Sequence, residues 1–386
     1  MNAALLPLGL YVHIPFCRQK CAYCDFYSLS NQESRMDDYV DALCAHIQKS
    51  APLAAAYQTD TVYFGGGTPS LLGPERLSRI LKTVLDTYTV VPEAEITLEA
   101  NPDSAGDRAA LEALRAAGFN RISLGMQSAC DEELREIGRV HTAEQIAAAV
   151  SAARAAGFEN LSLDLIYGLP HQTMERWMDN LSAAVALQPE HLSCYGLKVE
   201  KGTPLYARQS TTQLPGDEAQ ADMYLAMVDY LARHGYRQYE ISNFARPGKE
   251  SRHNLKYWTL GAYMGFGPGA HSDFGGLRYA YDRDLESYIR SAREGTPPHS
   301  EETVISPSER ESERVMLGLR TVQGLDAAEL SSSLPFLKNC EKAGYAVLEN
   351  GRWHLTPQGF LVSNQIISSL LDALAEDKRH RTETIS

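Results

Sequence analysis

Strand-type and helix-type segments alternate six times in the first 200 residues, and this alternation limits the fold more than any other feature. Such an alternation predicts a parallel sheet with helices packed outside it. The expected strands are Leu8–Ile14, Thr61–Phe64, Glu95–Glu99, Arg121–Leu124, Leu161–Leu165 and His191–Leu197. The expected helices, whose apolar residues recur at three- and four-residue steps, are Met36–Gln48, Pro74–Thr87, Ala109–Ala117, Ala143–Ala156 and Met174–Leu187.

Chemically distinctive motifs follow the ends of the first five expected strands. They are a cysteine-rich loop, a glycine-rich turn at Gly65–Pro69, and the segments Glu99–Pro102, Gly125–Gln127 and Tyr167–Pro170. A parallel sheet of this kind carries its active site at the carboxyl ends of its strands. The motifs are therefore expected to meet at one end of the sheet.

The first motif is the C-x3-C-x2-C pattern of Cys17, Cys21 and Cys24. Three thiolates can hold three corners of a [4Fe–4S] cube and leave the fourth iron open for chemistry. Three alternatives stay open at this point: a zinc site with His13 as fourth ligand, a disulfide, or three small residues on one helix face. Pro15 and the β-type residues before it argue against a helix here.

The cysteine pattern and three further motifs resemble the radical S-adenosylmethionine (SAM) superfamily. The four segments are Tyr11–Cys17, Gly65–Pro69, Asn120–Gln127 and Asp164–Pro170. More narrowly, they resemble the oxygen-independent coproporphyrinogen III oxidase group, and within it the HemW-type haem chaperones. The resemblance implies an α/β fold, a partial six-stranded (β/α) barrel of the TIM type that is open on one side.

The same resemblance implies the cofactors and the residues that hold them. Cys17, Cys21 and Cys24 would bind a [4Fe–4S] cluster, and SAM would occupy the open iron. The positions that match SAM contacts in the family are Tyr11, Gly66 and Glu99. In the coproporphyrinogen enzymes a second SAM is held by residues that match Tyr23, Gly67, Thr68, Gln127, Arg139 and Asp164.

Each of these residues also has a structural interpretation. The glycine-rich segment is consistent with a simple tight turn, because glycine adopts unusual dihedral angles. Glu99 is consistent with a solvated carboxylate at a strand end. Asp164 ends an apolar strand, where a carboxylate needs a partner, and Arg139 is expected to be that partner in a structural ion pair.

Phe26 decides between two functions within the resemblance. The coproporphyrinogen enzymes have a fourth cysteine at this position and an N-terminal extension before the residue that matches Tyr11. Both differences affect the substrate side and not the cluster. They favour a haem chaperone that passes haem to acceptor proteins, with a flavodoxin or ferredoxin as electron donor. The alternatives are a coproporphyrinogen III dehydrogenase, a radical methyltransferase or haem-degrading relative, and a non-enzymatic zinc protein.

A haem contact is expected at His253, Tyr257 and Trp258, in the pattern H-N-x-x-Y-W. An exposed histidine beside aromatic rings could bind haem iron and pack on the macrocycle. In the HemW-type family this pattern is a proposed haem-binding motif. The structural alternative is a capping histidine beside a buried aromatic pair.

The chain divides by pattern into four parts. Residues 1–212 form the expected barrel, 213–298 complete it and link it onward, 299–375 form a winged-helix-like unit, and 376–386 are a flexible tail. The unit is expected to contain helices at Ser308–Leu319, Asp326–Ser331 and Pro335–Ala343, a hairpin turned at Asn350–Gly351, and a last helix from Pro357. DNA binding and a packing lid are its two functional interpretations.

Composition limits the partners and the compartment. The net charge of −13 opposes binding to a nucleic-acid backbone, so no nucleic-acid partner is expected. No apolar stretch is long enough to span a membrane, and Met1–Leu8 does not read as a secretory signal, although peripheral membrane contact stays open. The scattered Cys44, Cys130, Cys194 and Cys340 read as buried small residues of a cytoplasmic protein.

Overall fold

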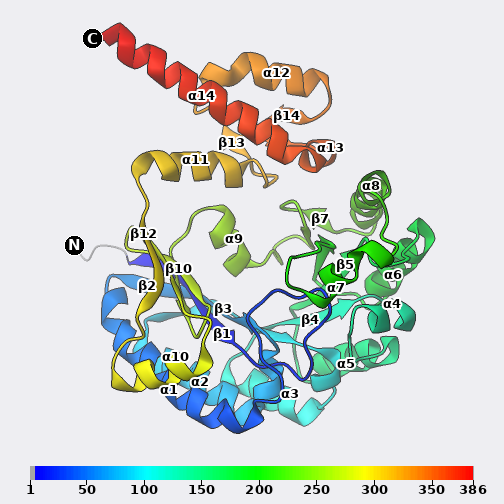
Figure 1. Cartoon of the computed structure of the whole chain (residues 1–386), viewed down its shortest axis with the longest axis vertical. Coiled ribbons are helices and arrows are strands. Elements are labelled where there is room, and N and C mark those ends of the chain that lie inside the picture. Colours follow the sequence, from blue (N-terminus) through cyan, green and yellow to red (C-terminus); the bar gives the residue numbers. More distant parts are fainter. Residues whose placement is uncertain (1–4, 386) are drawn as a thin grey trace.

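The computed structural model describes residues 5–385, with side chains up to residue 376. Residues 1–4 lie outside the described part. They are half of the Met1–Leu8 segment, which was predicted not to be a secretory signal. Six parallel strands form the centre of the molecule and curve around its interior (Figure 1), which confirms the expected parallel sheet. They are β1 (Leu6–Ile14), β2 (Tyr57–Gly66), β3 (Val90–Ala100), β4 (Arg121–Gln127), β5 (Leu161–Tyr167) and β6 (His191–Gly196).

Helices connect these strands and cover their outer face, as the alternation predicts. The connecting helices are α1 (Met36–Ser50), α2 (Pro74–Thr87), α3 (Arg108–Ala117), α4 (Asp131–Glu136), α5 (Ala143–Ala155) and α6 (Met174–Ala186). Local capping explains where several of them begin; in α5 the Thr142 and Gln145 side chains form a capping box. The short α4 was not expected, because six residues are too few to show helical periodicity.

The two faces of the central strands differ sharply in polarity. On β4, Ile122 and Leu124 are buried against the helices, whereas Arg121, Ser123 and Gln127 point the other way and line an internal cavity. β3 and β5 alternate in the same way. Parallel strands that are buried on both faces usually read as continuous apolar runs, and barrel interiors are usually filled with branched apolar residues. The polar inner face therefore indicates that this barrel surrounds a ligand site.

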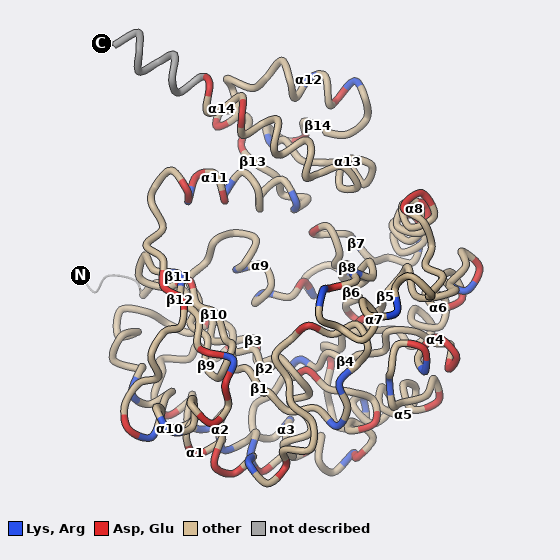
Figure 2. Tube along the Cα trace, in the orientation of Figure 1, with Lys and Arg blue, Asp and Glu red and all other residues tan. Residues whose placement is uncertain are grey.

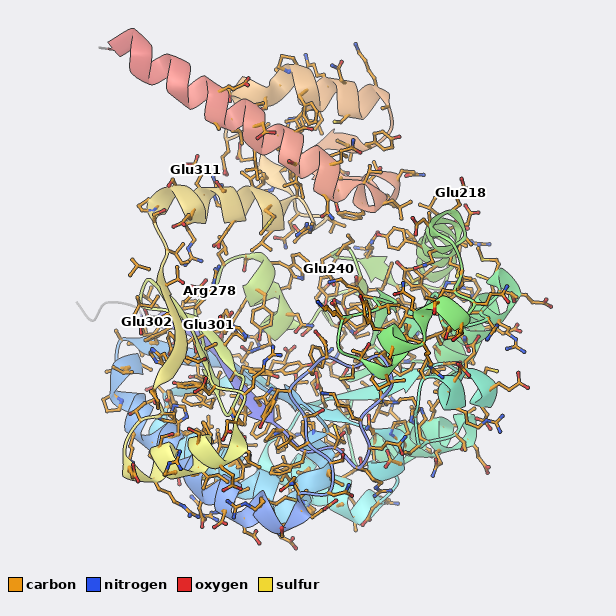
Figure 3. The ribbon with its side chains drawn as sticks, in the orientation of Figure 1. Glu218, Glu240, Arg278, Glu301, Glu302 and Glu311 are labelled. Atoms are coloured by element: carbon orange, nitrogen blue, oxygen red, sulfur yellow. The ribbon has the colours of Figure 1, made fainter. Side chains whose placement is uncertain are left out.

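Additional strands extend both edges of the six-stranded core into a twelve-stranded sheet. Beyond β6 lie β8 (Asn243–Ala245) and β7 (Arg237–Gln238), and beyond β1 lie β9 (Tyr263–Phe266), β10 (His271–Phe274), β11 (Leu277–Tyr281) and β12 (His299–Val304). All six residues of β12 are exposed. Figure 3 labels Glu301 and Glu302 on this edge strand and Arg278 on β11 beside it. Residues 299–304 were expected in the C-terminal unit, but they form β12 and belong to the main sheet.

The remaining helices are also defined in the described part of the chain. Those between the barrel and the C-terminal unit are α7 (Pro204–Ala207), α8 (Asp217–Arg233), α9 (Arg252–Trp258) and α10 (Leu285–Glu294). The C-terminal unit contains α11 (Pro307–Gly318), α12 (Leu334–Lys342), α13 (Pro357–Leu361), α14 (Ser363–Ile385) and a small sheet of β13 (Leu325–Asp326), β14 (Ala346–Glu349) and β15 (Arg352–Leu355).

The C-terminal unit confirms the hairpin and corrects two expectations. Asn350 and Gly351, with φ angles of 51° and 77°, turn the hairpin between β14 and β15. The helix expected at Asp326–Ser331 is wrong: this segment holds the end of β13 and a turn, because Leu325 and Asp326 pair with β15 instead. The tail that was expected to be loose is helical, since α14 continues to Ile385.

Buried backbone and ionic contacts join the C-terminal unit to the barrel. The backbone of Glu240, labelled in Figure 3, forms a β-bridge with Thr321, and its side chain is fully buried. On the other side, Arg310 of α11 donates to both carboxylate oxygens of Asp273 on β10, at 2.7 and 2.8 Å. The unit therefore packs on the edge strands, away from the cysteine loop.

Lys and Arg alternate with Asp and Glu along the described chain and do not gather in one element (Figure 2). None of the described helices is both long enough and apolar enough to cross a lipid bilayer.

Candidate functional site

A cavity of about 400 Å³ opens inside the barrel at the carboxyl ends of the parallel strands. This volume lies within the range typical of small-molecule sites. Eleven of the fifteen predicted site residues line it, and they come from strands and loops far apart in the sequence: Cys17, Cys21, Tyr23, Cys24, Gly66, Gly67, Thr68, Glu99, Gln127, Arg139 and Asp164. The other four, Tyr11, His253, Tyr257 and Trp258, do not line it.

The three cysteines occupy an irregular loop after β1, which excludes the helix-face alternative. The base of the loop is closed by backbone hydrogen bonds between Cys17 and Leu29 (2.9 Å) and between Leu29 and Pro15 (2.8 Å). All seven cysteines are free thiols, so no disulfide forms in this structure. The loop thus presents three unpaired thiols to one cavity.

The polar surroundings of the thiols fit an iron–sulfur cluster. The Thr68 hydroxyl lies 3.6 Å from the Cys17 sulfur, and Nη1 of Arg139 lies 3.5 Å from the Cys21 sulfur. Hydrogen bonds and positive charge next to thiolates stabilise such clusters and tune their potentials. Burial raises the pKa of the Cys24 thiol, a shift that binding to a metal would reverse.

A single-ion zinc site lacks its expected fourth ligand. His13 is buried, and its ring nitrogens contact the Tyr11 hydroxyl (3.0 Å) and the Tyr27 carbonyl oxygen (2.8 Å). Within residues 5–376, no three His, Cys, Asp or Glu side chains converge on one metal ion. In a [4Fe–4S] cube each thiolate binds a different iron, so its sulfurs stand farther apart than those around one zinc ion.

The glycine-rich turn after β2 packs directly against the cysteine loop. The Gly67 N–H donates to the Ile14 carbonyl oxygen (2.8 Å), and the Thr68 N–H donates to that of Phe16 (2.7 Å). A Cβ atom at Gly67 would lie 2.6 Å from the Phe16 oxygen and 3.1 Å from the Cys17 sulfur. Glycine is therefore required at this position for close packing against the cysteine loop.

We expect Gly67→Ala to reduce cluster occupancy several-fold and to destabilise the fold by roughly 1–3 kcal/mol, because the added methyl group displaces the Cys17 loop. Iron content after reconstitution and the thermal unfolding midpoint would measure both effects. Gly106→Ala is the matched control, since a Cβ there meets nothing within 4 Å. Equal iron contents in the two variants would contradict this expectation.

Glu99 is enclosed by donors in the cavity wall and is not a freely solvated carboxylate. Its Oε1 accepts from the Tyr63 hydroxyl (2.7 Å) and its Oε2 from the Gly66 N–H (3.2 Å). Burial raises the pKa of Glu99 to about 7 even though both hydrogen bonds favour the ionised form. The group is thus poised to change its charge near neutral pH.

The predicted pair of Arg139 and Asp164 does not form, and this expectation is wrong. The Nη2 atom of Arg139 donates to Asn101 Oδ1 and to the Gly125 carbonyl oxygen, both at 2.7 Å. Asp164 instead accepts from the Ser123 hydroxyl at 3.1 Å. Arg139 lies too near the cysteines, beside Cys21, to reach the middle of β5, so the two groups contact different parts of the cavity.

The exposed histidine on which the haem-ligand interpretation depends is not found. His253 is 1% exposed, and its ring nitrogens contact Thr61 Oγ1 (2.8 Å) and the Tyr257 hydroxyl (3.0 Å). Burial lowers the pKa of His253 to about 3, so the ring is neutral at physiological pH. Helix α9 packs this ring against Tyr63 of β2, at a centroid distance of 5.2 Å. Asn254, the next residue, is the one that reaches the cavity.

Several further cavity residues were not identified from the sequence: Tyr63, Asn101, Arg121, Ser123, Ser193 and Asn254. Most of them occupy alternate positions on the central strands, next to apolar residues that face the helices. The signal was present as a two-residue alternation of polar and apolar side chains in segments that were read as simple buried strands. Asn101 lies in the Glu99–Pro102 segment and Asn254 in the H-N-x-x-Y-W pattern, but neither residue was singled out within its motif.

Comparison with known proteins first defines the class. Residues 11–184 match the Radical SAM superfamily, and residues 305–362 match the HemN C-terminal domain. The solved structure of coproporphyrinogen III oxidase (HemN) from Escherichia coli superposes with a TM-score of 0.82 at 27% identity, covering 95% of this chain and 90% of that one. The fold and the cysteine cavity are those of a radical SAM protein, a class that implies a [4Fe–4S] cluster and SAM.

Two curated relatives then define the family. The protein named "Heme chaperone HemW" from Mycobacterium tuberculosis (strain H37Rv) is 37% identical over 95% of both chains. The protein of the same name from Bacillus subtilis (strain 168) is 35% identical, over 94% of this chain and 99% of its own length. The chain belongs to the HemW family of radical SAM proteins.

Proposed function

We propose that this protein is a haem chaperone that binds a [4Fe–4S] cluster, SAM and haem and delivers haem to acceptor proteins. The observation that carries the proposal is Phe26, which lines the mouth of the cavity and is 64% exposed. This residue stands where the coproporphyrinogen enzymes have a fourth cysteine. The cavity keeps the three cluster thiols and lacks that substrate-side thiol, in agreement with relatives named as haem chaperones over nearly their whole length.

Cys17, Cys21 and Cys24 would hold the cluster and leave one iron to the amino and carboxylate groups of SAM. When bound and reduced, the cluster supplies the electron that breaks a carbon–sulfur bond of SAM. Arg139 lies beside Cys21 and offsets part of the negative charge of the thiolates. Glu99 presents a carboxylate at the same end of the cavity, where it can accept a hydrogen bond from a bound amino or hydroxyl group.

The remaining predicted contacts divide by position. Gly66 donates its N–H to Glu99, and Gly67 and Thr68 pack against the cysteine loop, so this turn supports the cluster end. Tyr23, Gln127 and Asp164 lie in the same cavity and are available for SAM or a second ligand. Tyr11 does not line the cavity, and its hydroxyl group contacts the His13 ring instead. The electron donor and a cytoplasmic location stay predictions.

Haem binding by His253, Tyr257 and Trp258 would require α9 to move. The buried ring of His253 would have to leave Thr61 and Tyr257 before it could bind iron. We therefore propose that helix α9, which carries the H-N-x-x-Y-W pattern, has a structural role in the conformation described here. Haem contacts from this helix would require a second conformation in which α9 has moved.

One assay separates the proposed function from its main alternative. Anaerobically reconstituted protein is titrated with haem and is separately incubated with coproporphyrinogen III, SAM and a reductant. We expect a saturable Soret shift with haem and no protoporphyrinogen above background, because the substrate-side cysteine is absent. E. coli HemN, the structural relative at 27% identity, is the positive control for the second reaction. Formation of protoporphyrinogen at a comparable rate would support the dehydrogenase instead.

A further inference from the structure

A buried arginine with an unsatisfied N–H group faces the cavity from the start of β4. Arg121 is 2% exposed and lines the cavity wall. Its Nε–H has no hydrogen-bond acceptor among the described residues. A buried charged group normally has its donors satisfied, so each exception requires an explanation.

Two further polar groups accompany Arg121. Thr97 lies opposite Arg121 in the register of β3 and β4, and its buried hydroxyl also lacks a partner. Asn254 of α9 lines the same cavity as Arg121. Arg121 and Asn254 together offer guanidinium and amide N–H groups to one space.

Nearby carboxylates keep Arg121 charged but do not accept from its Nε–H. Burial lowers the pKa of Arg121, but the nearby acidic groups, Glu95 foremost and Asp164 among them, together outweigh this effect, so the net shift is upward. The Glu95 oxygens accept from the N–H groups of Arg252 and His253 at the start of α9. Asp164 accepts from Ser123. Both acids therefore have other donors, and the Nε–H of Arg121 has no acceptor.

The ligand group that satisfies a guanidinium fork is a carboxylate, which takes two parallel N–H bonds from an arginine. We propose that Arg121, assisted by Asn254, binds a carboxylate of a molecule held in this cavity. For the function proposed above, on which this inference rests, that group is supplied either by a propionate of haem or by the carboxylate of SAM. Arg121 would then be a binding residue at the floor of the barrel.

This floor subsite is distinct from the cluster end. Arg139 bonds the Gly125 carbonyl oxygen beside Cys21, whereas Arg121 enters the cavity from four residues earlier on β4, where the backbone lies about 13 Å farther back along the strand. A SAM carboxylate on the open iron would lie near Arg139. The distance therefore favours a haem propionate as the partner of Arg121.

The decisive comparison removes the carboxylate from the ligand and leaves the protein intact. We expect wild-type protein, reconstituted with its cluster, to bind haem at least tenfold more tightly than haem dimethyl ester, in which both propionates are esterified. Arg121→Met should bind the two with equal affinity. SAM and decarboxylated SAM form the second arm. Arg252→Met, which removes an exposed arginine of α9, is the matched control and should behave as wild type.

The outcomes separate the two sources and the two proposals. If Arg121→Met weakens the binding of haem but not that of haem dimethyl ester, Arg121 binds a propionate. If it weakens the binding of SAM but not that of decarboxylated SAM, Arg121 binds the carboxylate of SAM. If haem does not bind wild-type protein, the proposed function fails, and the SAM arm alone decides this inference. If Arg121→Met does not fold, Arg121→Lys, which keeps the charge and loses the fork, replaces it. Unchanged affinity of both ligands in the folded variant would overturn the inference.

Discussion

Replacement of Cys21 by alanine is expected to abolish assembly of the [4Fe–4S] cluster, from about four irons per chain to a background level. The three thiols share one cavity wall and the fourth corner belongs to SAM, so no other cysteine can replace a lost ligand. Cys44, Cys194 and Cys340 are buried elsewhere, and Cys130 does not line the cavity. Iron and acid-labile sulfide after anaerobic reconstitution would measure the loss, together with the charge-transfer absorption.

Cys130→Ala is the control for this experiment, because it removes a partly exposed thiol outside the cavity. It should retain the full complement of iron. Cys17→Ala and Cys24→Ala should behave like Cys21→Ala. Retention of four irons by any of the three would show that this cysteine is not a ligand, and a stoichiometric zinc content in the wild type would favour the zinc alternative.

The second large effect is expected at Glu99. Since the pKa of Glu99 is about 7, its ionised fraction rises about tenfold between pH 6 and pH 8. If the ionised form accepts a hydrogen bond from SAM, the affinity for SAM should rise by about the same factor over this range. Glu99→Gln should bind SAM at least tenfold more weakly at pH 8 and lose this part of the pH dependence. Calorimetric titration of both proteins across the range would measure it.

The same substitution has an opposite effect on stability. The folded pKa of Glu99 lies above its ordinary value of 4.5, so the folded state binds a proton more tightly than the unfolded state. This contribution is fully present below pH 4.5 and is lost as the pH rises through 7, at a cost of up to about 3 kcal/mol. Glu99→Gln should therefore be more stable than wild type at pH 8. Glu93→Gln, on an exposed part of β3, is the control and should change neither property. A parallel loss of stability and affinity would contradict the assignment.

The central architecture could be predicted from the sequence because periodicity and spacing agreed. Six apolar runs separated by amphipathic segments leave few arrangements other than a parallel sheet, and the motifs at the strand ends then had to meet. The edge strands β9 to β12 could not be predicted in this way. They form in a segment rich in glycine and aromatic residues, and they are held by pairing with β1 and with each other, which local patterns do not encode.

The site residues that belong to sequence motifs could be predicted. The burial and the hydrogen-bond partners of other side chains depend on tertiary contacts and could not be predicted. The cysteines and the glycine-rich turn were placed together by topology alone. His253 was expected at the surface, yet the packing of α9 against Tyr63 buries it. Arg139 was expected to pair with Asp164, and its actual partners, Asn101 and the Gly125 carbonyl oxygen, carry no charge that a sequence pattern could reveal.

The open edge of β12 has a consequence for how copies of this protein meet in solution. Its outer backbone groups are free to pair with another strand, which is the usual route to edge-to-edge aggregation. Two antiparallel copies of this strand would bring Glu301 of one against Glu302 of the other, and such like-charged neighbours repel. The acidic pair thus opposes edge-to-edge pairing of two copies of this strand.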